Sequence, residues 1–463
     1  MKSFVRLFLV LLASGATTFV QAEQRPPNIL FIVLDDQNTF AGRSDLAPVP
    51  VSPNMNRIEA KGVSFLNANC TAPVCNPSRT SFLSGLRPST SGIYSNSQGR
   101  TQADHILTRT TPLPIWFRER GYLTAGCGKV FSSAHGSFLK NRIWDEAPPR
   151  NREKVPEPKG APVQGLGKND WAPSPVPREQ LPDWKNAEWA AEFLMRPQPE
   201  PFFLAVGIVK PHTPWYLPQE YFDLFPPEQL DLPPLAEDEN AGLPSSVKVK
   251  VKVKDGPDER VERRNEMVSA YLAASRYADD CVGRVLDGLE EGPHLADTIV
   301  VYFSDHGYEF GDKHNWSKGS VREGSARVPL VVAGPGLPQG KTSTRPVSLL
   351  DLYPTLVELA GLPVNPDNEG RSFVPLLRQP DAKWDHAAIT TSGYRNHAVR
   401  TERWRYIRYE DGAEELYDHQ SDPLGRTNLA ADPEFTEWKR KLGRWLPGHD
   451  EPVNPPIESG EAR

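Results

Sequence analysis

The stretch NILFIVLDDQ, Asn28 to Gln37, is a continuous run of apolar residues that ends in two adjacent carboxylates. The stretch TIVVYFSDHG, Thr298 to Gly307, repeats this design and ends with Asp305 and His306. Apolar runs of this length are typical of strands buried on both faces of a parallel sheet. Both stretches therefore predict central strands of one sheet.

Further strand and helix patterns alternate around these two runs. PFFLAVGIVK from Pro201 and VPLVVAGPG from Val328 predict two more strands. DWKNAEWAAEFLMR, before Pro201, and NEMVSAYLAASRYADDCVGRVLDGLEE, before Thr298, are typical of helices. This alternation predicts an α/β fold with a large, doubly wound, mostly parallel sheet flanked by helices. We place this domain at residues 23–392.

The pattern changes toward the C-terminus. The stretch HAVRTERWRYIRYEDGAEELYDHQSDP, 397–423, contains short strand patterns and a turn signal at residues 410–412. It predicts a small antiparallel-sheet α+β subdomain at residues 393–463, packed against the main domain. The Pro-, Gly- and charge-rich segment 148–182 predicts a long surface excursion. SVKVKVKVKD, 246–255, favours an exposed edge strand protected by lysines, with a polyanion-binding strip as the alternative.

The N-terminus has the features of a secretory signal. Lys2 and Arg6 precede an apolar run, and Val20-Gln21-Ala22 resembles a signal cleavage site. The run is too short for a membrane anchor, and no other stretch approaches the ~18 apolar residues that a span requires. We expect residues 1–22 to be a signal peptide and the protein to be exported, to the periplasm or the extracellular space.

Net charge argues against nucleic acid as a partner, and the cysteine content argues against a disulfide framework. Residues 1–22 carry two positive charges and no negative ones, so removing them changes the net charge from −6 to −8. An acidic protein is a poor general binder of nucleic acid. The four cysteines are few for 463 residues and lack metal-ligand spacing. If Cys75 serves chemistry, at most one disulfide can form among Cys70, Cys127 and Cys281.

The stretch TAPVCNPSRTSFLSG, 71–85, places a cysteine at a predicted helix start. Asn76 suits the N-cap, Pro77 the first turn and Gly85 the C-terminal end. Cys75 would then lie at the positive end of the helix dipole, where anions bind and cysteines become reactive. The alternative is a buried cysteine that packs beside the helix start.

Acidic residues follow both central strand patterns. Asp35 and Asp36 end the first, and Asp305 with His306 follows the second. Ligands of open α/β sheets bind beyond the carboxyl ends of the strands. Carboxylates that converge there repel one another unless a cation lies among them, and an oxygen-rich set favours calcium or magnesium. Acid pairs also occur in loops and helix caps, which is the alternative.

Three basic residues lie in similar contexts. Lys129 follows AGCG, His212 lies in VKPHTPW directly after an apolar strand, and Lys318 lies in NWSKGS. Taken singly, a lysine is normally a solvated charge and a histidine is more often structural.

Taken together, these segments resemble the formylglycine-dependent sulfatases of the alkaline phosphatase superfamily. The signature is Cys-x-Pro-Ser-Arg, here Cys75 to Arg79, followed by a short helix that ends at Gly85. NILFIVLDD, GKVF, FFLAVGIVKPHTPW, SDHG and WSKGS support it, and their order and content look most like the iduronate-2-sulfatase branch. The resemblance extends from Asn28 to the ELYDHQSDP region, most of the mature chain.

The resemblance implies a role for Cys75. In this family the cysteine is oxidised to Cα-formylglycine by a maturation enzyme that reads residues of the types of Pro77 and Arg79 in the unfolded chain. The aldehyde hydrates to a diol, one hydroxyl attacks sulfur, and the other expels sulfate by reforming the aldehyde. A thiol could perform the first step but not this release.

The resemblance also implies the metal ligands and the catalytic groups. Calcium, rather than magnesium, would be held by Asp35, Asp36, Asp305, His306 and the diol of residue 75, where it acts as Lewis acid and template. Arg79 would hold the formylglycine hydroxyl, Lys129 and Lys318 would stabilise charge on the sulfuryl oxygens, and His212 would protonate the departing alcohol.

The chain departs from the branch at one position. Relatives carry a histidine three residues after the lysine of GKVF, where this chain has Ser132. The next histidine is His135, which we include with Lys129, His212 and Lys318 as a substrate-binding candidate. Either His135 reaches the site or Ser132 takes a lesser role.

The predicted function is hydrolysis of O-sulfate esters on a sulfated carbohydrate, such as a glycosaminoglycan-like oligosaccharide. One alternative is a phosphate or phosphonate monoester hydrolase of the same superfamily. Another is a non-catalytic binder of sulfated glycans.

Overall fold

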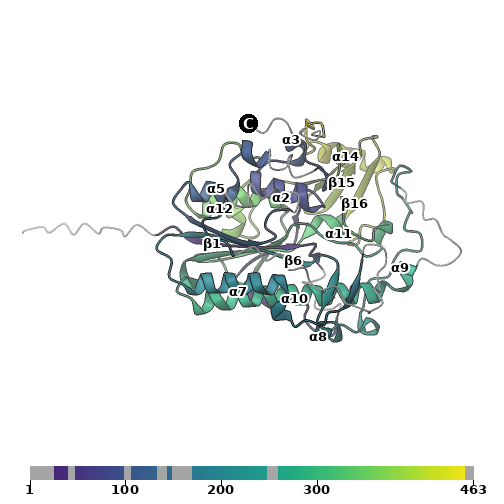
Figure 1. Ribbon diagram of the computed structural model, residues 1–463. Coiled ribbons are helices and arrows are strands. Elements are labelled where there is room, and N and C mark those ends of the chain that lie inside the picture. The colour runs from purple at the N-terminus through teal and green to yellow at the C-terminus, as the bar shows by residue number, and fades with distance from the viewer. Residues whose placement is uncertain are drawn as a thin grey trace, which may run out of the picture.

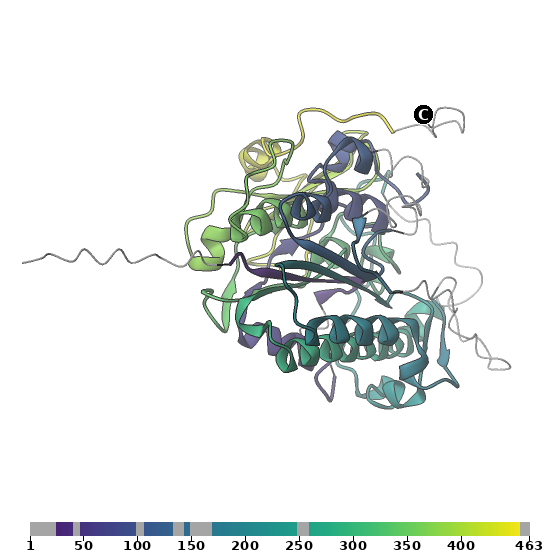
Figure 2. The same ribbon diagram turned by 60° about the vertical axis from the view of Figure 1, so that its left-hand side comes forward.

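The computed structural model describes residues 25–39, 47–98, 106–132, 143–148, 169–247 and 259–453. Here the chain forms three layers, a central sheet with helices on both faces (Figures 1 and 2). This confirms the predicted α/β class. The predicted signal peptide, His135, most of the lysine-rich stretch and residues 149–168 of the predicted excursion lie outside the described residues.

The central sheet has seven strands and is mostly parallel, as predicted. β1 pairs in parallel with β6 on one side and β8 on the other, while β10 is antiparallel to both of its neighbours. The order across the sheet is β11 (Lys341–Ser343), β2 (Gly62–Phe65), β10 (Leu330–Ala333), β8 (Thr298–Ser304), β1 (Asn28–Asp35), β6 (Phe202–Pro211) and β4 (Leu123–Gly128).

Between its two polar ends, strand β1 is apolar from residue 29 to residue 34, because it contributes to a core on each face of the sheet. Leu30, Ile32 and Leu34 pack into one core, and Ile29 and Phe31 pack into the other. The first core is covered by α1 (Pro53–Ala60), α7 (Pro182–Met195) and α10 (Arg264–Glu291), the second by α2 (Cys75–Ser84), α5 (Leu113–Arg118) and α12 (Leu352–Leu359).

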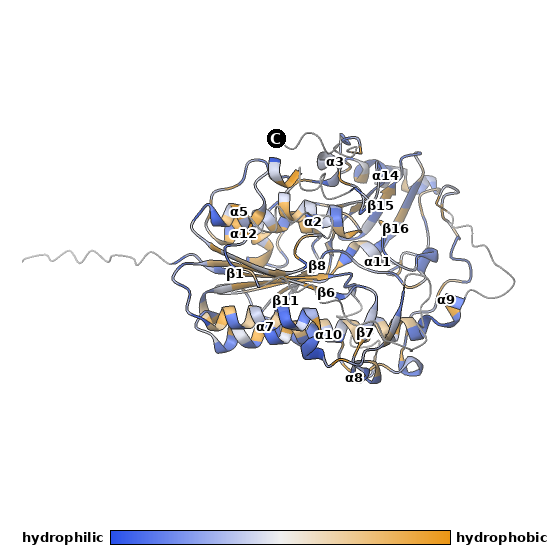
Figure 3. Ribbon diagram, in the orientation of Figure 1, coloured by the Kyte–Doolittle hydropathy of each residue, from blue (hydrophilic) through white to orange (hydrophobic). Residues whose placement is uncertain are grey.

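The two helix layers are visible in Figure 1, with α7 and α10 below the sheet and α2, α5 and α12 above it. Figure 3 shows the strands in the colours of apolar residues, while α7 and α10 carry hydrophilic residues on their outer sides. α7 and α10 are the two helices that the sequence patterns predicted, to within one residue at each end. α7 begins with Pro182, whose missing N–H costs nothing in the first turn.

Two glycines allow β4 and β6 to approach closely at their carboxyl ends. Gly128 has a φ of +66°, and a Cβ there would lie 1.9 Å from the carbonyl oxygen of Gly207. A Cβ on Gly207 would lie 2.1 Å from the carbonyl carbon of Lys129. The backbone from which the Lys129 side chain extends is therefore packed directly against β6.

The C-terminal part contains the predicted small antiparallel sheet, packed against α11 (Glu323–Ala326) and, in Figure 1, at the upper right of the molecule. Its strands follow chain order: β13 (Ala388–Thr391), β14 (His397–Arg400), β15 (Trp404–Arg408) and β16 (Glu414–Asp418). β13 begins before residue 393, the predicted start of the subdomain. The turn between β15 and β16 includes Gly412, with a φ of +83°.

The remaining strands and α-helices are short, apart from the C-terminal helix. They are β3 (Ala68–Asn69), β5 (Trp171–Pro173), β7 (Trp215–Leu217), β9 (Arg327–Val328), β12 (Val347–Ser348), α3 (Pro88–Ser91), α8 (Gln219–Asp223), α9 (Glu259–Glu262), α13 (Val374–Arg378) and α14 (Thr436–Gly443). In the described part of the chain, no helix combines the length and apolar character that crossing a membrane requires.

Candidate active site

Three buried carboxylates meet at the carboxyl end of the central sheet. Asp35 is the last residue of β1, and Asp305 directly follows β8. The N–H of Asp305 donates to the carbonyl of Leu34 (3.1 Å), and the N–H of Asp36 donates to Oδ1 of Asp305 (3.2 Å). All three aspartates are completely buried. The parallel pairing of β1 and β8 brings the two acidic strand ends together.

Asp36 has a left-handed backbone conformation, with a φ of +70°. Such a φ is uncommon outside glycine, although aspartate tolerates it better than most residues. The Tyr271 hydroxyl donates to the Asp36 carbonyl (2.8 Å) and accepts from the N–H of Asn38 (2.7 Å). The N–H of Gln37 donates to Oγ of Ser304 (2.9 Å). The fold thus holds a strained residue in place, which is common at functional sites.

Cys75 is the first residue of α2, and the structure corrects the predicted cap. Val74, not Asn76, is the N-cap residue. The Asn76 side chain instead donates to two backbone carbonyls, and its own N–H donates to Oδ1 of Asn96 (2.8 Å). Pro77 does lie in the first turn, and Gly85 ends the helix with a φ of +79°. The prediction of Asn76 as the cap was wrong because the side chain of Asn96, twenty residues away, satisfies the free N–H of residue 76.

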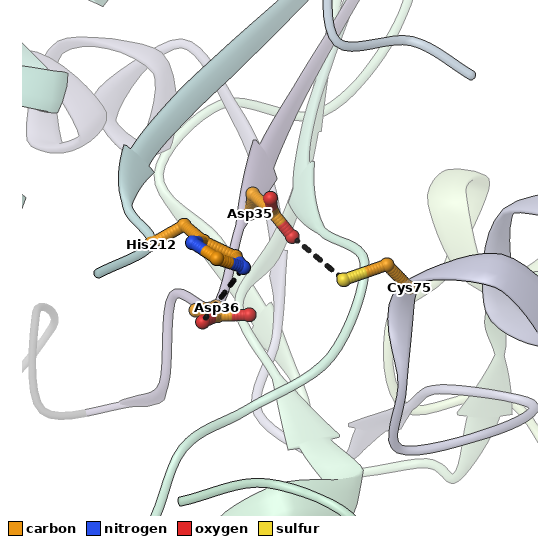
Figure 4. A group of neighbouring side chains, drawn as sticks. All are labelled: Asp35, Asp36, Cys75 and His212. Atoms are coloured by element: carbon orange, nitrogen blue, oxygen red, sulfur yellow. Dashed lines mark hydrogen bonds and ion pairs between the residues drawn. The ribbon is translucent and has the colours of Figure 1, made fainter. Parts of the chain in front are cut away.

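The thiol of Cys75 points at the acids (Figure 4). Its Sγ lies 3.3 Å from Oδ1 of Asp35, 3.3 Å from Nε2 of His306 and 3.3 Å from Nζ of Lys318, with Nζ of Lys129 at 3.8 Å. Burial, with help from Asp35, raises the pKa of the Cys75 thiol to about 12. The unmodified thiol is therefore protonated near neutral pH and is a poor nucleophile.

Arg79 links α2 to both acidic strand ends. Its guanidinium is completely buried, its Nε donates to Oδ2 of Asp305 (2.8 Å), and its Nη2 lies 3.6 Å from Oδ1 of Asp35. Its Nη1 also donates to the backbone carbonyls of Lys129 and Val130. One helical turn after Cys75, this side chain fixes the start of α2 against β1, β4 and β8.

Lys129 and Lys318 reach the site from the two sides of β1: Lys129 directly follows β4, and Lys318 lies in the loop after β8. Lys129 Nζ forms an ion pair with Oδ2 of Asp35, and Lys318 Nζ donates to Oδ1 of Asp36 (2.6 Å). Burial alone would raise the pKa of Asp35, but Lys129 and the other nearby cations hold that pKa well below its usual range. The two lysine side chains are 17% and 15% exposed, so both border the entrance of the site.

His212 lies on the turn after β6 and is the most exposed of these groups, with 30% of its side chain accessible. Its Nδ1 lies 2.5 Å from the carbonyl of Thr213, which accepts only if Nδ1 carries the proton. Its Nε2 lies 4.0 Å from Oδ2 of Asp36 (Figure 4). The ring therefore presents Nε2 to the acid cluster.

The other predicted candidates have different outcomes. Ser132 is buried, and since His135 lies outside the described residues, the choice between them stays a prediction. Each of the four cysteines is free, so no disulfide links Cys70, Cys127 and Cys281.

The acid cluster fits a hard divalent cation. One oxygen, nitrogen or sulfur atom from each of Asp35, Cys75, Asp305 and His306 lies within 4.8 Å of the others, and Asp35, Asp36, Cys75 and His212 form a second such group. Oδ2 of Asp36 is buried and has no hydrogen-bond partner among the described residues. A carboxylate-rich set with an unsatisfied oxygen is what calcium or magnesium requires. The sulfur of Cys75 is one of the atoms in both groups.

Comparison with known families identifies the class of protein. The family model described as Sulfatase matches residues 27–362. A second model, described as N-sulphoglucosamine sulphohydrolase, C-terminal, matches residues 311–450. The first match covers more than half of the chain. The chain therefore belongs to the sulfatase family and is a sulfuric ester hydrolase.

Individual relatives agree with the family match. A sulfatase of Formosa agariphila is 37% identical, over 92% of this chain and 88% of its own. Human iduronate 2-sulfatase is 32% identical, over 80% of this chain and 76% of its own. The structure of a 2-O GAG sulfatase superposes with a TM-score of 0.69 at 25% identity and covers 91% of each chain.

Proposed function

We propose that this chain hydrolyses O-sulfate esters of a sulfated carbohydrate, using a formylglycine made from Cys75 and a calcium ion. The observation that carries the proposal is the position of Cys75. Its Sγ lies 3.3 Å from Asp35, from His306 and from Lys318, at the start of a buried helix. A side chain that must be both nucleophile and metal ligand needs these neighbours.

The calcium ion would be held by Asp35, Asp36, Asp305 and His306 together with residue 75. It would supply a Lewis acid for a sulfate oxygen and would favour the ionised form of the attacking hydroxyl. His306 is suited to this place because its Nδ1 lies 3.1 Å from the Gly307 carbonyl, which leaves Nε2 directed at Asp36 (3.4 Å) and Asp305 (3.5 Å).

A formylglycine hydrate at residue 75 would supply one hydroxyl for attack on sulfur and a second one to release sulfate. The chain's own residues do the rest. Arg79 is locked by Asp305 and by two backbone carbonyls, so it can hold a hydroxyl of residue 75 without moving. Lys129 and Lys318 both approach Sγ, and they can donate to sulfuryl oxygens that gain charge as the ester bond breaks.

His212 completes the site as proton donor. Its Nε2 is the free ring nitrogen on the site side, and its side chain is the most exposed of the group. A proton on Nε2 would pass to the departing alcohol oxygen as the sulfur–oxygen bond breaks. A sugar alcohol leaves poorly as an alkoxide, so this step matters most for carbohydrate esters.

Two relatives support a carbohydrate substrate, since their names describe an iduronate 2-sulfatase and a 2-O GAG sulfatase. The N-terminal residues 1–22 support export, which would bring the protein to polymeric substrates outside the cytoplasm.

The test is hydrolysis of a panel of sulfated mono- and disaccharides with calcium, after the mass of the peptide that contains residue 75 has been measured. We expect the mass of formylglycine and release of inorganic sulfate from at least one sugar. Paired aryl sulfate, phosphate and phosphonate esters are the control. A preference for phosphorus esters by orders of magnitude would favour the phosphate or phosphonate hydrolase instead.

The binder alternative has its own test. Cys75→Ser should bind sulfated glycans and release no sulfate, while the mature wild type turns over. If the wild type with verified formylglycine also releases nothing from any ester, the chain is a binder of sulfated glycans and the proposed reaction is wrong.

A further inference from the structure

Lys210 is a buried cation that the reaction described so far does not use. It lies near the end of β6 with 7% of its surface exposed. It forms no ion pair with any residue in the described ranges. Burial lowers the pKa of Lys210 to about 8. Burying a charge without a direct counter-ion is costly, so this residue needs a structural or functional reason.

The Lys210 side chain turns back onto the segment that carries His212. Its Nζ donates to the carbonyl of His212 (3.1 Å) and to the carbonyl of Pro214. These two peptides flank Thr213. Lys210 thus holds the turn by binding two backbone carbonyl oxygens of the turn, one on each side of Thr213.

Asp183, in the first turn of α7, fixes the end of β6, directly before this turn, through the backbone N–H groups of that strand. Both carboxylate oxygens lie 3.0 Å from the N–H nitrogen of Val209, and Oδ2 also accepts from the N–H of Lys210 (2.9 Å). The end of β6 and the following turn are therefore held from two directions, by Asp183 and by Lys210.

The Thr213 carbonyl, between the two carbonyls that Lys210 holds, is the group that orients the His212 ring. It lies 2.5 Å from Nδ1 and so keeps the proton on that nitrogen. Nε2 is then directed at the acid cluster, 4.0 Å from Asp36. The orientation of the ring depends on the orientation of one peptide, and Lys210 holds both neighbours of that peptide.

We propose that Lys210 is a positioning residue for His212: its ammonium group holds the turn 212–214 so that Nε2 of His212 faces the departing oxygen of the substrate. This inference rests on the proposed role of His212 as proton donor. It predicts that Lys210 affects the step in which the alcohol leaves and not the binding of sulfate.

The test compares leaving groups. In Lys210→Met, which keeps the length and removes the donors, kcat/KM for phenyl sulfate should fall by about 10²-fold, the scale of general acid catalysis. With 4-nitrophenyl sulfate, whose leaving group departs without a proton, the fall should be less than about 5-fold. His212→Ala should show the same dependence, and the double variant should lose no more than His212→Ala alone.

Lys313 offers a matched control. It is also 7% exposed, and its Nζ donates to two backbone carbonyls, those of Ala241 (3.3 Å) and Arg426 (2.9 Å), away from His212. Lys313→Met should lower the rate for both esters equally, if at all. Lys210→Arg, which retains the donors, should restore much of the phenyl sulfate rate.

A second readout does not depend on turnover. In a ¹⁵N spectrum of the imidazole nitrogens, with the His212 signals assigned by their loss in His212→Ala, the wild type should show Nδ1 protonated and Lys210→Met a mixture of tautomers. If Lys210→Met does not fold, Lys210→Gln replaces it in both measurements.

The outcomes test the positioning role of Lys210 separately from the proton-donor role of His212. Equal losses on both esters, with an unchanged His212 tautomer, would mean that Lys210 is structural only. If His212→Ala itself shows no dependence on the leaving group, the proposed role of His212 is wrong.

Discussion

The molecule contains two buried clusters of charge, and they differ in how the charges are matched. The active-site cluster comprises Asp35, Asp36 and Asp305 with Arg79, Lys129 and Lys318. The interface cluster, between α11 and the C-terminal sheet, comprises Glu323 and Glu415 with Arg322, Arg400 and Arg405. Both have short ion pairs and little solvent exposure, so neither property by itself distinguishes catalysis from structure.

In the interface cluster the acids are outnumbered and fully paired. Arg405 donates to Glu323 at 2.6 and 2.9 Å, and Arg400 reaches both oxygens of the same carboxylate at 3.2 Å. Arg322 binds Glu415 through two nitrogens, at 2.6 and 3.0 Å. Planar, two-point contacts of this kind are rigid and leave no oxygen for a further ligand.

In the active-site cluster the pairing is incomplete. Oδ2 of Asp36 has no hydrogen-bond partner in the described part of the chain, and the same residue has a strained backbone. The two clusters therefore differ in one respect: the active-site cluster has an unmatched carboxylate oxygen beside Cys75, and the carboxylates of the interface cluster are fully paired.

The largest expected effect tests the active-site cluster. Cys75→Ala should lower the rate of sulfate release by on the order of 10⁴-fold or more, because no other side chain can form the attacking group. Thermal unfolding should remain within a few degrees of wild type. Cys281→Ala, at another buried free cysteine, should keep full activity per folded molecule. Retained turnover in Cys75→Ala would show that the nucleophile is a different group.

The next largest effect tests the interface cluster. Glu323→Gln leaves Arg400 and Arg405 without their carboxylate, which should cost about 3–5 kcal/mol of unfolding free energy. Activity per folded molecule should change by less than about 3-fold, since Glu323 contacts no reacting group. Denaturant titrations and initial rates measure the two effects. A loss of activity without a loss of stability would place Glu323 in the catalytic machinery.

The same variant has a pH signature. Burial alone would raise the pKa of Glu323, but Arg400 and Arg405 hold it well below its usual range. A carboxylate with a lowered folded pKa stabilises the protein above its unfolded pKa, near 4.5, and loses this contribution as pH falls through the folded pKa. The difference in stability between wild type and Glu323→Gln should therefore be full at pH 7 and shrink below about pH 4.5.

The smallest expected effect concerns calcium and needs no turnover. Calcium at about 100 times its Kd should stabilise the wild type by about 2.7 kcal/mol, and chelation should reverse this. Asp36→Asn should lose most of the effect, because the unmatched oxygen disappears. Glu415→Gln, in the interface cluster, should retain the full calcium shift on a lower baseline. An equal shift in wild type and Asp36→Asn would mean that the ion binds elsewhere.

The sequence was sufficient for most of the sheet and for the residues that converge on it. Continuous apolar runs identify β1 and β8, and strands that run in parallel must place Asp35 and Asp305 at the same edge. Sequence spacing also indicated the helix that starts at Cys75, because Pro77 and Gly85 are strong local signals. These features depend on neighbours along the chain or on a repeated pattern.

Features that depend on partners far apart in the chain were not predictable. The Asn96 side chain accepts from the N–H of Asn76 at the start of α2, and nothing local to either residue indicates this. Lys210 lies in a motif that had been noted for His212, but a single lysine after a strand is normally solvated. Glu323 and Arg405 are separated by 82 positions, and only the packing of the small sheet on α11 brings them together.

The glycines at positions 128 and 207 restrict how this enzyme can diverge. A methyl group on either glycine would separate the ends of β4 and β6 and shift Lys129, so neither position tolerates even alanine. We therefore expect the pair of glycines to persist unchanged in active descendants.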